Sequence, residues 1–225
     1  MSIIDNYRRI RDEIDAIALS CGRDPGDIRI IAVSKNFSAE IVQEAIDGGI
    51  SLFGENRVQE AKGKIPMLRS DCVFHMVGHL QSNKARDAVR FFEMIHSIDT
   101  IGTAERLHEE AARAGKKQKI LIQVNASGEE SKSGIAPDAA MELVDGVTAL
   151  GSLELHGLMT MAPFTDDDTV IRGCFGAARA LLGRINEERD LHLRELSMGM
   201  SSDYRIAVEE GATMVRIGTA LFGNR

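Results

Sequence analysis

Apolar positions along this chain follow two periods. Near the N-terminus, Ile3, Tyr7, Ile10, Ile14 and Ile17 recur three or four residues apart, a spacing that predicts an amphipathic helix. Further along, short apolar runs follow amphipathic stretches, and a glycine that can end a helix stands before several of them. Runs of this length and composition are typical of buried strands. The pattern therefore predicts helices and strands that alternate along the chain.

Eight short strands are predicted, at residues 28–33, 50–53, 73–77, 94–98, 120–124, 153–158, 193–196 and 213–217. The intervening helices are expected near residues 38–47, 56–69, 82–90, 101–114, 137–149, 168–187 and 202–210. Eight βα repeats in 225 residues fit a single TIM-like (β/α)8 barrel domain over residues 1–225. We expect the extra N-terminal helix to close it, in place of a helix after strand eight. The main alternative is a doubly wound open sheet.

Polar residues gather directly after most of the predicted strands. Strand one leads into Ser34-Lys35-Asn36, strand two into Gly54-Glu55-Asn56-Arg57, and strand seven into residues 197–203. A barrel carries its functional groups in the loops after its strands, all at one face. The clustering therefore favours the barrel over an open sheet and predicts a site at the carboxyl ends of the strands.

Composition and charge narrow the class of protein. The 27 Lys and Arg residues against 34 Asp and Glu residues give a net charge of −7, which argues against a nucleic-acid partner. No apolar stretch is long enough to span a membrane, and the N-terminus does not resemble a signal peptide. We therefore expect a cytoplasmic protein without a membrane partner. The cysteines, Cys21, Cys72 and Cys174, are scattered, so we expect neither a disulfide framework nor a zinc knuckle.

Lys35 is the first candidate for chemistry, because it directly follows the apolar strand one. At that position its amine would project into a partly desolvated barrel mouth. A lysine held deprotonated in such a place attacks carbonyl carbons and forms Schiff bases. The alternative is an ordinary surface lysine at the end of a strand.

Two loops suggest a phosphate site. Residues 197–202 form a hydroxyl-rich turn that contains glycine, and Gly218-Thr219 follows strand eight. Both loops offer backbone N–H groups, and barrels commonly bind phosphate after strands seven and eight. Helix capping by Ser201 or Ser202 is the alternative for one loop alone. Because both loops occur at the two expected strands, a phosphate site is favoured.

Other candidates have less support. His75 and His79 are four residues apart on a strand and its exit, and no third ligand is evident, so we expect no metal site. Met200 belongs to a methionine-rich set that is typical of core filling. For Tyr204 we expect packing or helix-cap contact rather than acid catalysis.

Several long segments resemble one known family. They are Ala32-Val33-Ser34-Lys35, residues 53–61, residues 75–84, Ser131-Lys132-Ser133-Gly134 and residues 196–223. In this order they resemble the pyridoxal phosphate homeostasis protein family, over residues 8–223. The barrel of this family is similar to the N-terminal domain of alanine racemase.

The resemblance implies pyridoxal 5′-phosphate (PLP) as cofactor, held as a Schiff base on Lys35. It implies contacts to the phosphate from Ser201, Gly218 and Thr219, a place beside the ring for Asn56, and an Arg216 that faces the pyridine nitrogen. A permanent cation there disfavours ring protonation and weakens the cofactor as an electron sink. The full set of expected cofactor-binding residues is Lys35, Asn56, Met200, Ser201, Arg216, Gly218 and Thr219.

Lys132 matches a family lysine that we associate with cofactor transfer, although the sequence does not place it. After Lys35 this chain reads Asn36-Phe37-Ser38, where many family members have Thr-Lys-Pro. The Schiff-base lysine is unchanged, whereas the second basic residue beside it is absent and the shape of the first loop is open.

The expected role is that of a carrier. Racemisation needs a base on each face of the substrate's α-carbon, and alanine racemase takes the second one from a C-terminal β domain. This chain ends at Arg225, shortly after strand eight. We therefore expect a non-catalytic, monomeric protein that buffers and delivers PLP and contacts apo PLP enzymes transiently. The alternatives are a PLP-dependent amino-acid racemase and a barrel that binds another phosphorylated metabolite without a Schiff base.

Overall fold

A closed barrel of parallel strands forms the centre of the computed structural model, which describes residues 2–69, 72–129 and 133–223. Each strand pairs in parallel with its neighbour in sequence order, and β8 returns to pair with β1. This confirms the barrel and shows that the open-sheet alternative is wrong. The strands are β1 Arg29–Val33, β2 Leu52–Glu55, β3 Val73–Met76, β4 Met94–Ile98, β5 Gln118–Gln123, β6 Leu153–Met159, β7 Glu195–Ser197 and β8 Met214–Ile217.

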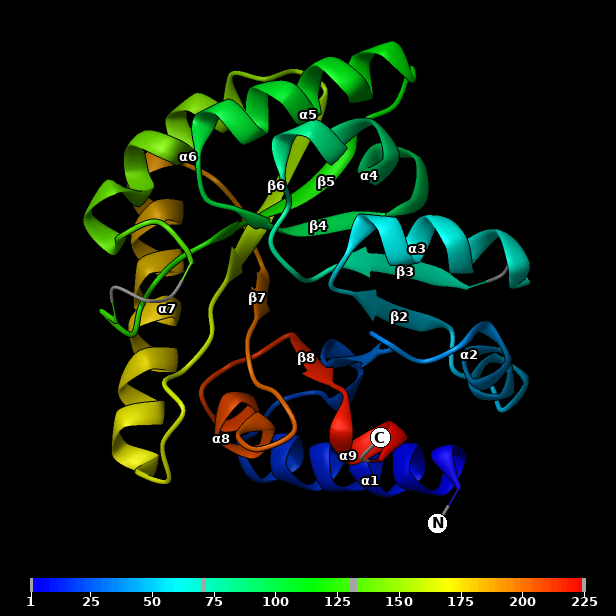
Figure 1. Ribbon diagram of the computed structural model, residues 1–225. Coiled ribbons are helices and arrows are strands. Elements are labelled where there is room, and N and C mark those ends of the chain that lie inside the picture. The colour runs from blue at the N-terminus through cyan, green and yellow to red at the C-terminus, as the bar shows by residue number, and fades with distance from the viewer. Residues whose placement is uncertain (1, 70–71, 130–132, 224–225) are drawn as a thin grey trace.

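Helices surround the barrel on its outside (Figure 1). Several are shorter than predicted because a 3-10 turn replaces one end, at Ile65–Met67, Ser82–Lys84 and Pro137–Ala139. The third helix also begins late, since Arg57 has an extended backbone. The helices are α1 Ile3–Ser20, α2 Ala39–Asp47, α3 Val58–Lys64, α4 Ala85–Phe91, α5 Ile101–Arg113, α6 Ala140–Thr148, α7 Asp168–Arg189, α8 Tyr204–Glu209 and α9 Thr219–Phe222.

The end of the barrel differs from the prediction. A short helix, α9, does follow β8, so the expectation that α1 stands in its place is wrong. Instead α1 packs against both α8 and α9, which lie above it in Figure 1. The Asn6 side-chain amide donates to the carbonyl of Leu221 at 3.0 Å. Four helical residues are too few to show a hydrophobic period, which is why the sequence pattern did not reveal α9.

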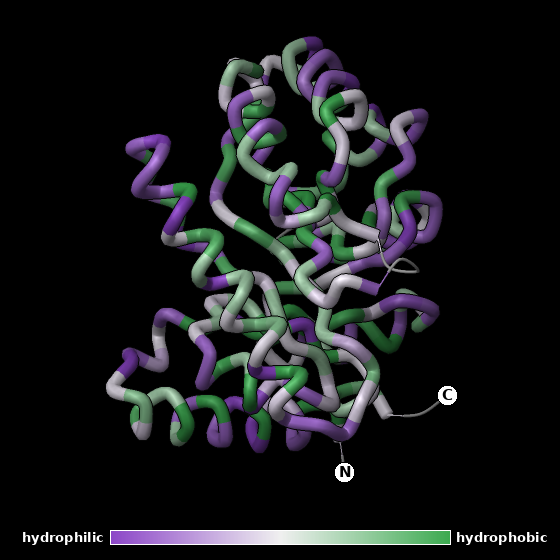
Figure 2. Tube along the Cα trace, turned by 90° about the vertical axis from the view of Figure 1, so that its left-hand side faces the viewer, coloured by the Kyte–Doolittle hydropathy of each residue, from purple (hydrophilic) through white to green (hydrophobic). Residues whose placement is uncertain are grey.

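Apolar residues form two layers. The larger lies between the strands and the helices, and the smaller fills the barrel interior with residues such as Ile31, Leu121 and Met214. Figure 2 shows hydrophobic segments at the centre and hydrophilic ones on the outer helices. No helix in the described part of the chain is both long and apolar enough to cross a membrane.

Polar side chains also occupy the barrel interior. His75 Nδ1 lies 3.0 Å from His96 Nε2, and His96 Nδ1 lies 2.9 Å from the Ser197 hydroxyl, which accepts a hydrogen bond from Arg216 at 2.8 Å. His79 is exposed and lies 3.9 Å from Asp99. The histidine pair singled out in the sequence therefore does not converge.

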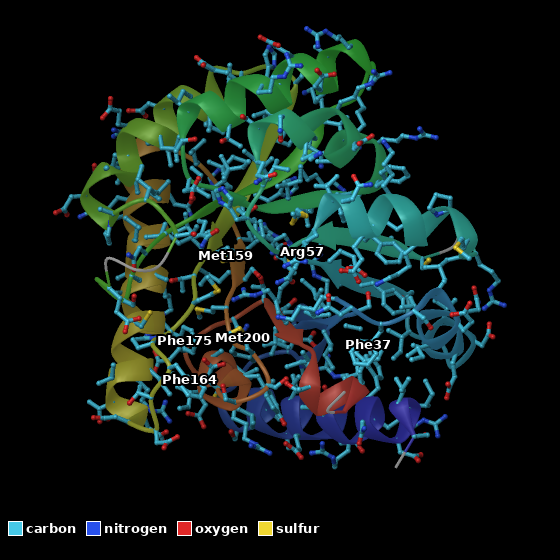
Figure 3. All side chains as sticks on the ribbon, viewed as in Figure 1. Phe37, Arg57, Met159, Phe164, Phe175 and Met200 are labelled. Atoms are coloured by element: carbon cyan, nitrogen blue, oxygen red, sulfur yellow. The ribbon has the colours of Figure 1, made fainter. Side chains whose placement is uncertain are left out.

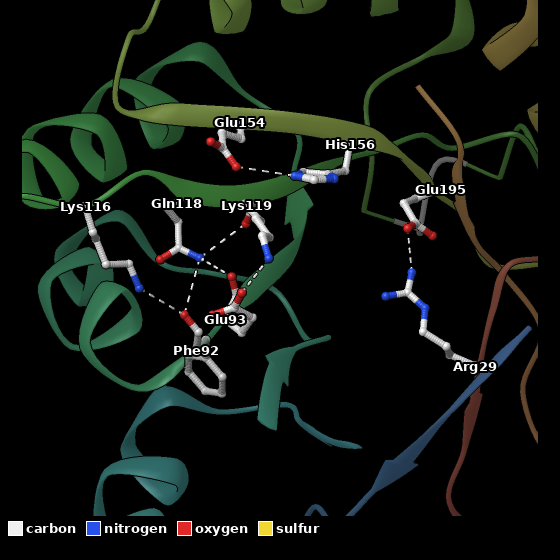
Figure 4. Close-up of polar contacts among 9 residues, drawn as sticks. All are labelled: Arg29, Phe92, Glu93, Lys116, Gln118, Lys119, Glu154, His156 and Glu195. Carbon is white, nitrogen blue, oxygen red and sulfur yellow. Dashed lines mark hydrogen bonds and ion pairs between the residues drawn. The ribbon is translucent and has the colours of Figure 1, made fainter. Parts of the chain in front are cut away.

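Ion pairs lie near the amino ends of the strands (Figure 4). Arg29 lies 2.5 Å from Glu195, and Lys119 lies 2.6 Å from Glu93. Lys116, at the same end, instead donates to the backbone carbonyls of Val89 at 2.7 Å and Phe92 at 3.4 Å. The opposite end, where the strands lead into the loops, carries the cavity described next.

Candidate functional site

One cavity of about 670 Å³ lies at the carboxyl ends of the strands. It brings together all seven residues that the sequence pattern and the family resemblance assigned to the cofactor, from the ends of β1, β2, β7 and β8. Their roles as ligands stay a prediction. The lining residues are Val33, Lys35, Phe37, Asn56, Val77, Met161, Phe164, Met200, Ser201, Ser202, Arg216, Gly218, Thr219 and Gly223.

Lys35 reaches the cavity because of strand alternation. Ile31 and Val33 point into the barrel, and Lys35 continues that alternation two residues later. The next residue, Asn36, has a φ of +63°, a left-handed conformation that asparagine tolerates better than most residues. Lys35 is exposed, so the expected partial desolvation is wrong. The physical reason is that its side chain leaves a loop at the rim rather than the packed interior.

Arg216 is the buried cation of the site, with 5% of its surface exposed. Its guanidinium donates to the Ser197 hydroxyl at 2.8 Å and to the Thr160 carbonyl at 2.9 Å. Burial lowers its pKa to about 10, an effect that the negative charge of Asp203 opposes. The side chain is therefore still charged at neutral pH and is held in one orientation.

The two predicted phosphate loops meet at Ser201. Its hydroxyl oxygen accepts from the backbone N–H of Gly218 at 3.3 Å and of Ala220 at 3.2 Å. These contacts place the loop after β7 against the chain that follows β8. Hydroxyl and backbone N–H groups are suitable donors for an oxyanion.

Replacing Ser201 by alanine is expected to weaken phosphate binding at this cavity. The change removes one hydroxyl donor and loosens the contact between the two loops, so affinity for a phosphorylated ligand should fall about tenfold, equivalent to about 1.4 kcal/mol. Calorimetric titration with PLP measures it. Ser202→Ala, at the neighbouring lining residue, is the matched control and should have a smaller effect.

Asn56 depends on a close backbone approach by Gly78. A Cβ added to Gly78 would lie 2.3 Å from the Asn56 carbonyl oxygen and 2.7 Å from its Cα. Backbone atoms at such distances must move apart.

We therefore expect Gly78→Ala to displace Asn56 from its place in the cavity. The free energy of unfolding should fall by about 1–3 kcal/mol, and PLP affinity should fall with it. Denaturant unfolding and ligand titration measure the two effects. Gly63→Ala is a control, because an added Cβ there meets no atom within 4 Å; equal losses in both variants would contradict the prediction.

Several apolar lining residues were not predicted from the sequence. Phe37 stacks on Phe222 with ring centroids 4.9 Å apart, so the segment that departs from the family pattern ties the first loop to α9. Phe164 is fully exposed at the rim; Figure 3 shows it with Met200 and Phe37 around this end of the barrel. No hydropathy signal separates such residues from core positions.

Two other sequence predictions have different outcomes. The Tyr204 hydroxyl donates to Glu13 on α1 at 2.5 Å, and burial followed by this hydrogen bond raises its pKa to about 12. Tyr204 is also 2% exposed within the apolar core, so its expected packing is confirmed, while its not serving as an acid stays a prediction. Lys132 lies outside the described residues.

Comparisons with known proteins agree with this architecture. A sequence model for the N-terminal domain of alanine racemase matches residues 6–225. The pyridoxal phosphate homeostasis protein of Pseudomonas aeruginosa is 41% identical over 225 residues, which cover 100% of this chain and 96% of the relative. The Escherichia coli K12 protein of the same name is 40% identical over 227 residues, covering 99% and 97%.

Solved structures give the same result. PipY of Synechococcus elongatus, solved with PLP bound, has a TM-score of 0.88 at 37% identity, and the match covers 99% of this chain and 100% of PipY. Alanine racemase of Clostridium difficile has a TM-score of 0.79 at 16% identity and covers 98% of this chain but 57% of the enzyme. The second likeness shows the fold alone.

The fold and the cavity together define a (β/α)8 barrel of the type found in the N-terminal domain of alanine racemase, with a lysine at the end of its first strand. Sequence identity assigns the chain to a narrower group than the fold does. The chain belongs to the pyridoxal phosphate homeostasis protein family.

Proposed function

We propose that this protein binds PLP in the cavity, holds it covalently on Lys35, and buffers or delivers it without catalysing amino-acid chemistry. The observation that carries the proposal is one cavity that joins a primary amine to a set of oxyanion donors. The names of the relatives and the PLP bound in PipY support it. When bound, PLP would supply an aldehyde carbon with which a neutral lysine amine condenses, and the aldehyde oxygen would leave as water.

The chain's own groups fit the parts of this cofactor. Ser201 and the backbone of Gly218 and Thr219 line one side of the cavity and suit the phosphate. Lys35 lines the same cavity from β1 and suits the aldehyde. Arg216 offers a buried cation to the ring, and a fixed positive charge there disfavours a proton on the ring nitrogen. That arrangement favours holding the cofactor over using it as an electron sink.

The lining residues also support a carrier over a racemase. Racemisation needs two groups that exchange protons on opposite faces of the substrate. Among the described lining residues, Lys35 is the one amine base, and the set contains no carboxylate, histidine, cysteine or tyrosine. Tyr204 is engaged with Glu13 outside this set.

A spectroscopic titration tests the proposal. The purified protein is titrated with PLP, reduced with borohydride and mapped by peptide mass, and then assayed for turnover of a panel of amino acids. We expect a visible absorption band, a reduced adduct on Lys35 and no turnover. Absence of the band would overturn PLP binding on Lys35, and sustained racemase or decarboxylase turnover would overturn the carrier role.

A further inference from the structure

A buried group of charges lies directly beneath the turn that carries Lys35. At its centre is Lys64, the last residue of α3, whose side chain is 6% exposed. Its ammonium donates to the Ser34 carbonyl at 2.8 Å, to Glu55 Oε1 at 2.7 Å and to Glu60 Oε1 at 2.8 Å. A lysine ammonium has three donors, so these contacts account for all of them.

The same carboxylates bind the residues on either side of Lys35. The Ser34 hydroxyl donates to Glu55 Oε1 at 2.7 Å, and the Asn36 backbone N–H donates to Glu60 Oε1 at 2.5 Å. The backbone carbonyl before Lys35 and the backbone N–H after it are therefore both fixed by one ion cluster. That cluster also supports the left-handed conformation of Asn36.

Stability alone does not account for this cluster. Burying ions costs free energy, and well-packed apolar replacements are often as stable. Glu55 is fully buried, and its second oxygen, Oε2, has no hydrogen-bond partner within the described part of the chain. Burial raises the pKa of the Glu55 carboxyl, against the opposing effect of hydrogen bonds from Lys64 and Ser34. What the cluster supplies is a defined position for the turn.

We propose that Lys64 is a positioning residue for Lys35, acting together with Glu55 and Glu60. The cluster fixes the backbone on both sides of Lys35, so that its long, exposed side chain starts from one direction and its amine reaches the cavity. Placing a nucleophile in this way lowers the entropic cost of forming the covalent bond. The inference rests on the proposed function, because it assigns the positioning to the reaction of Lys35 with PLP.

Two ligands separate positioning from general support of the site. PLP carries the aldehyde that reacts with Lys35, whereas pyridoxine 5′-phosphate has a hydroxymethyl group in its place and keeps the ring and phosphate. A substitution that disturbs only the position of Lys35 weakens the binding of PLP and leaves the binding of pyridoxine 5′-phosphate unchanged. A loosened cavity weakens both ligands together.

The variants are Lys64→Met, which removes the ammonium, and Glu60→Ala, which removes the acceptor for the Asn36 N–H. Glu60→Gln keeps an acceptor oxygen and is the conservative variant. Lys62→Met is the matched control, because Lys62 lies on the same helix, is exposed, and pairs with Asp87 at 3.0 Å. Each variant is titrated with both ligands, and the rate of band formation with PLP is followed by stopped flow.

We expect Lys64→Met and Glu60→Ala to lower both the PLP affinity and the rate of band formation about ten- to hundredfold. Affinity for pyridoxine 5′-phosphate should change less than about twofold, which is within 0.4 kcal/mol. Glu60→Gln should recover most of the loss, and Lys62→Met should behave as the wild type.

Wild-type affinity and rate in folded Lys64→Met and Glu60→Ala would overturn the inference, and so would equal losses for both ligands. Should Lys64→Met not fold, Glu60→Ala decides the matter, since that carboxylate is partly exposed and its loss is less disruptive. If the wild type itself forms no band with PLP, the proposed function falls and the positioning role falls with it.

Discussion

Replacing Lys35 by alanine is expected to abolish the visible absorption band that forms on addition of PLP. The amine of Lys35 lines the cavity together with Ser201 and Arg216, and without it no primary amine among the described lining residues can bind the aldehyde. In this variant PLP would be held only by noncovalent contacts to its phosphate and ring. The affinity for PLP should therefore fall by about two orders of magnitude, or about 3 kcal/mol. Absorption spectra and borohydride trapping measure both effects.

Two controls make this result specific to Lys35. Lys35→Arg keeps a positive charge at the same place, yet a guanidinium is not expected to form a stable adduct with the aldehyde, so it should also lack the band. Lys62→Ala removes an exposed lysine from α3 and should keep the band unchanged. A band of normal intensity in Lys35→Ala would mean that another lysine carries the cofactor.

Acidification is expected to destabilise the folded barrel through its buried histidines. Burial lowers the pKa of His75 from 6.5 to about 3 and holds that of His96 well below its ordinary value. At pH values between 6.5 and the lowered pKa values of the folded chain, these histidines take up protons in the unfolded chain but not in the folded chain. The free energy of unfolding therefore decreases as the pH falls below about 6.5. At pH 5 the loss approaches about 2 kcal/mol for His75, and His96 lowers the stability in the same direction.

Urea unfolding at pH 7.5 and at pH 5 measures this loss. Relative to the wild type, His96→Asn should show a smaller decrease between the two pH values, although its stability at pH 7.5 is lower because hydrogen bonds to His75 and Ser197 are lost. His79→Asn is the control, because that side chain is 55% exposed. A pH dependence that is identical in the wild type and His96→Asn would contradict the prediction.

Most of the barrel could be predicted from local pattern. Most strands contain a compact apolar run, and α7 shows a stripe in which Ile171, Phe175, Ala178, Leu182 and Ile185 are all buried. The boundaries of helices and strands, and the shortest elements, could be predicted less well. The turn of α9, which packs against α1, and the extended backbone of Arg57 leave no period in the sequence.

The site shows the same division. The sequence predicted four of the site residues, because each follows an apolar strand and carries a recognisable polar or glycine signal: Lys35, Ser201, Gly218 and Thr219. The sequence did not predict a role for Lys64, because a lysine near the end of an amphipathic helix is ordinarily exposed to solvent. Its burial against Glu55 and Glu60 follows from how α3 packs beneath the first loop.

The amino-acid sequence by itself determined the order of the strands and of helices α1 to α8, and it showed that polar residues gather at the ends of most strands. Both follow from local hydrophobic periodicity and from alternation along the strand. Only the tertiary structure decided which of those strand ends meet at one cavity, that Lys35 is exposed while Arg216 is buried, and that Lys64 lies beneath the Lys35 turn. The physical reason is that burial and ion pairing depend on which distant segments pack together once the barrel closes.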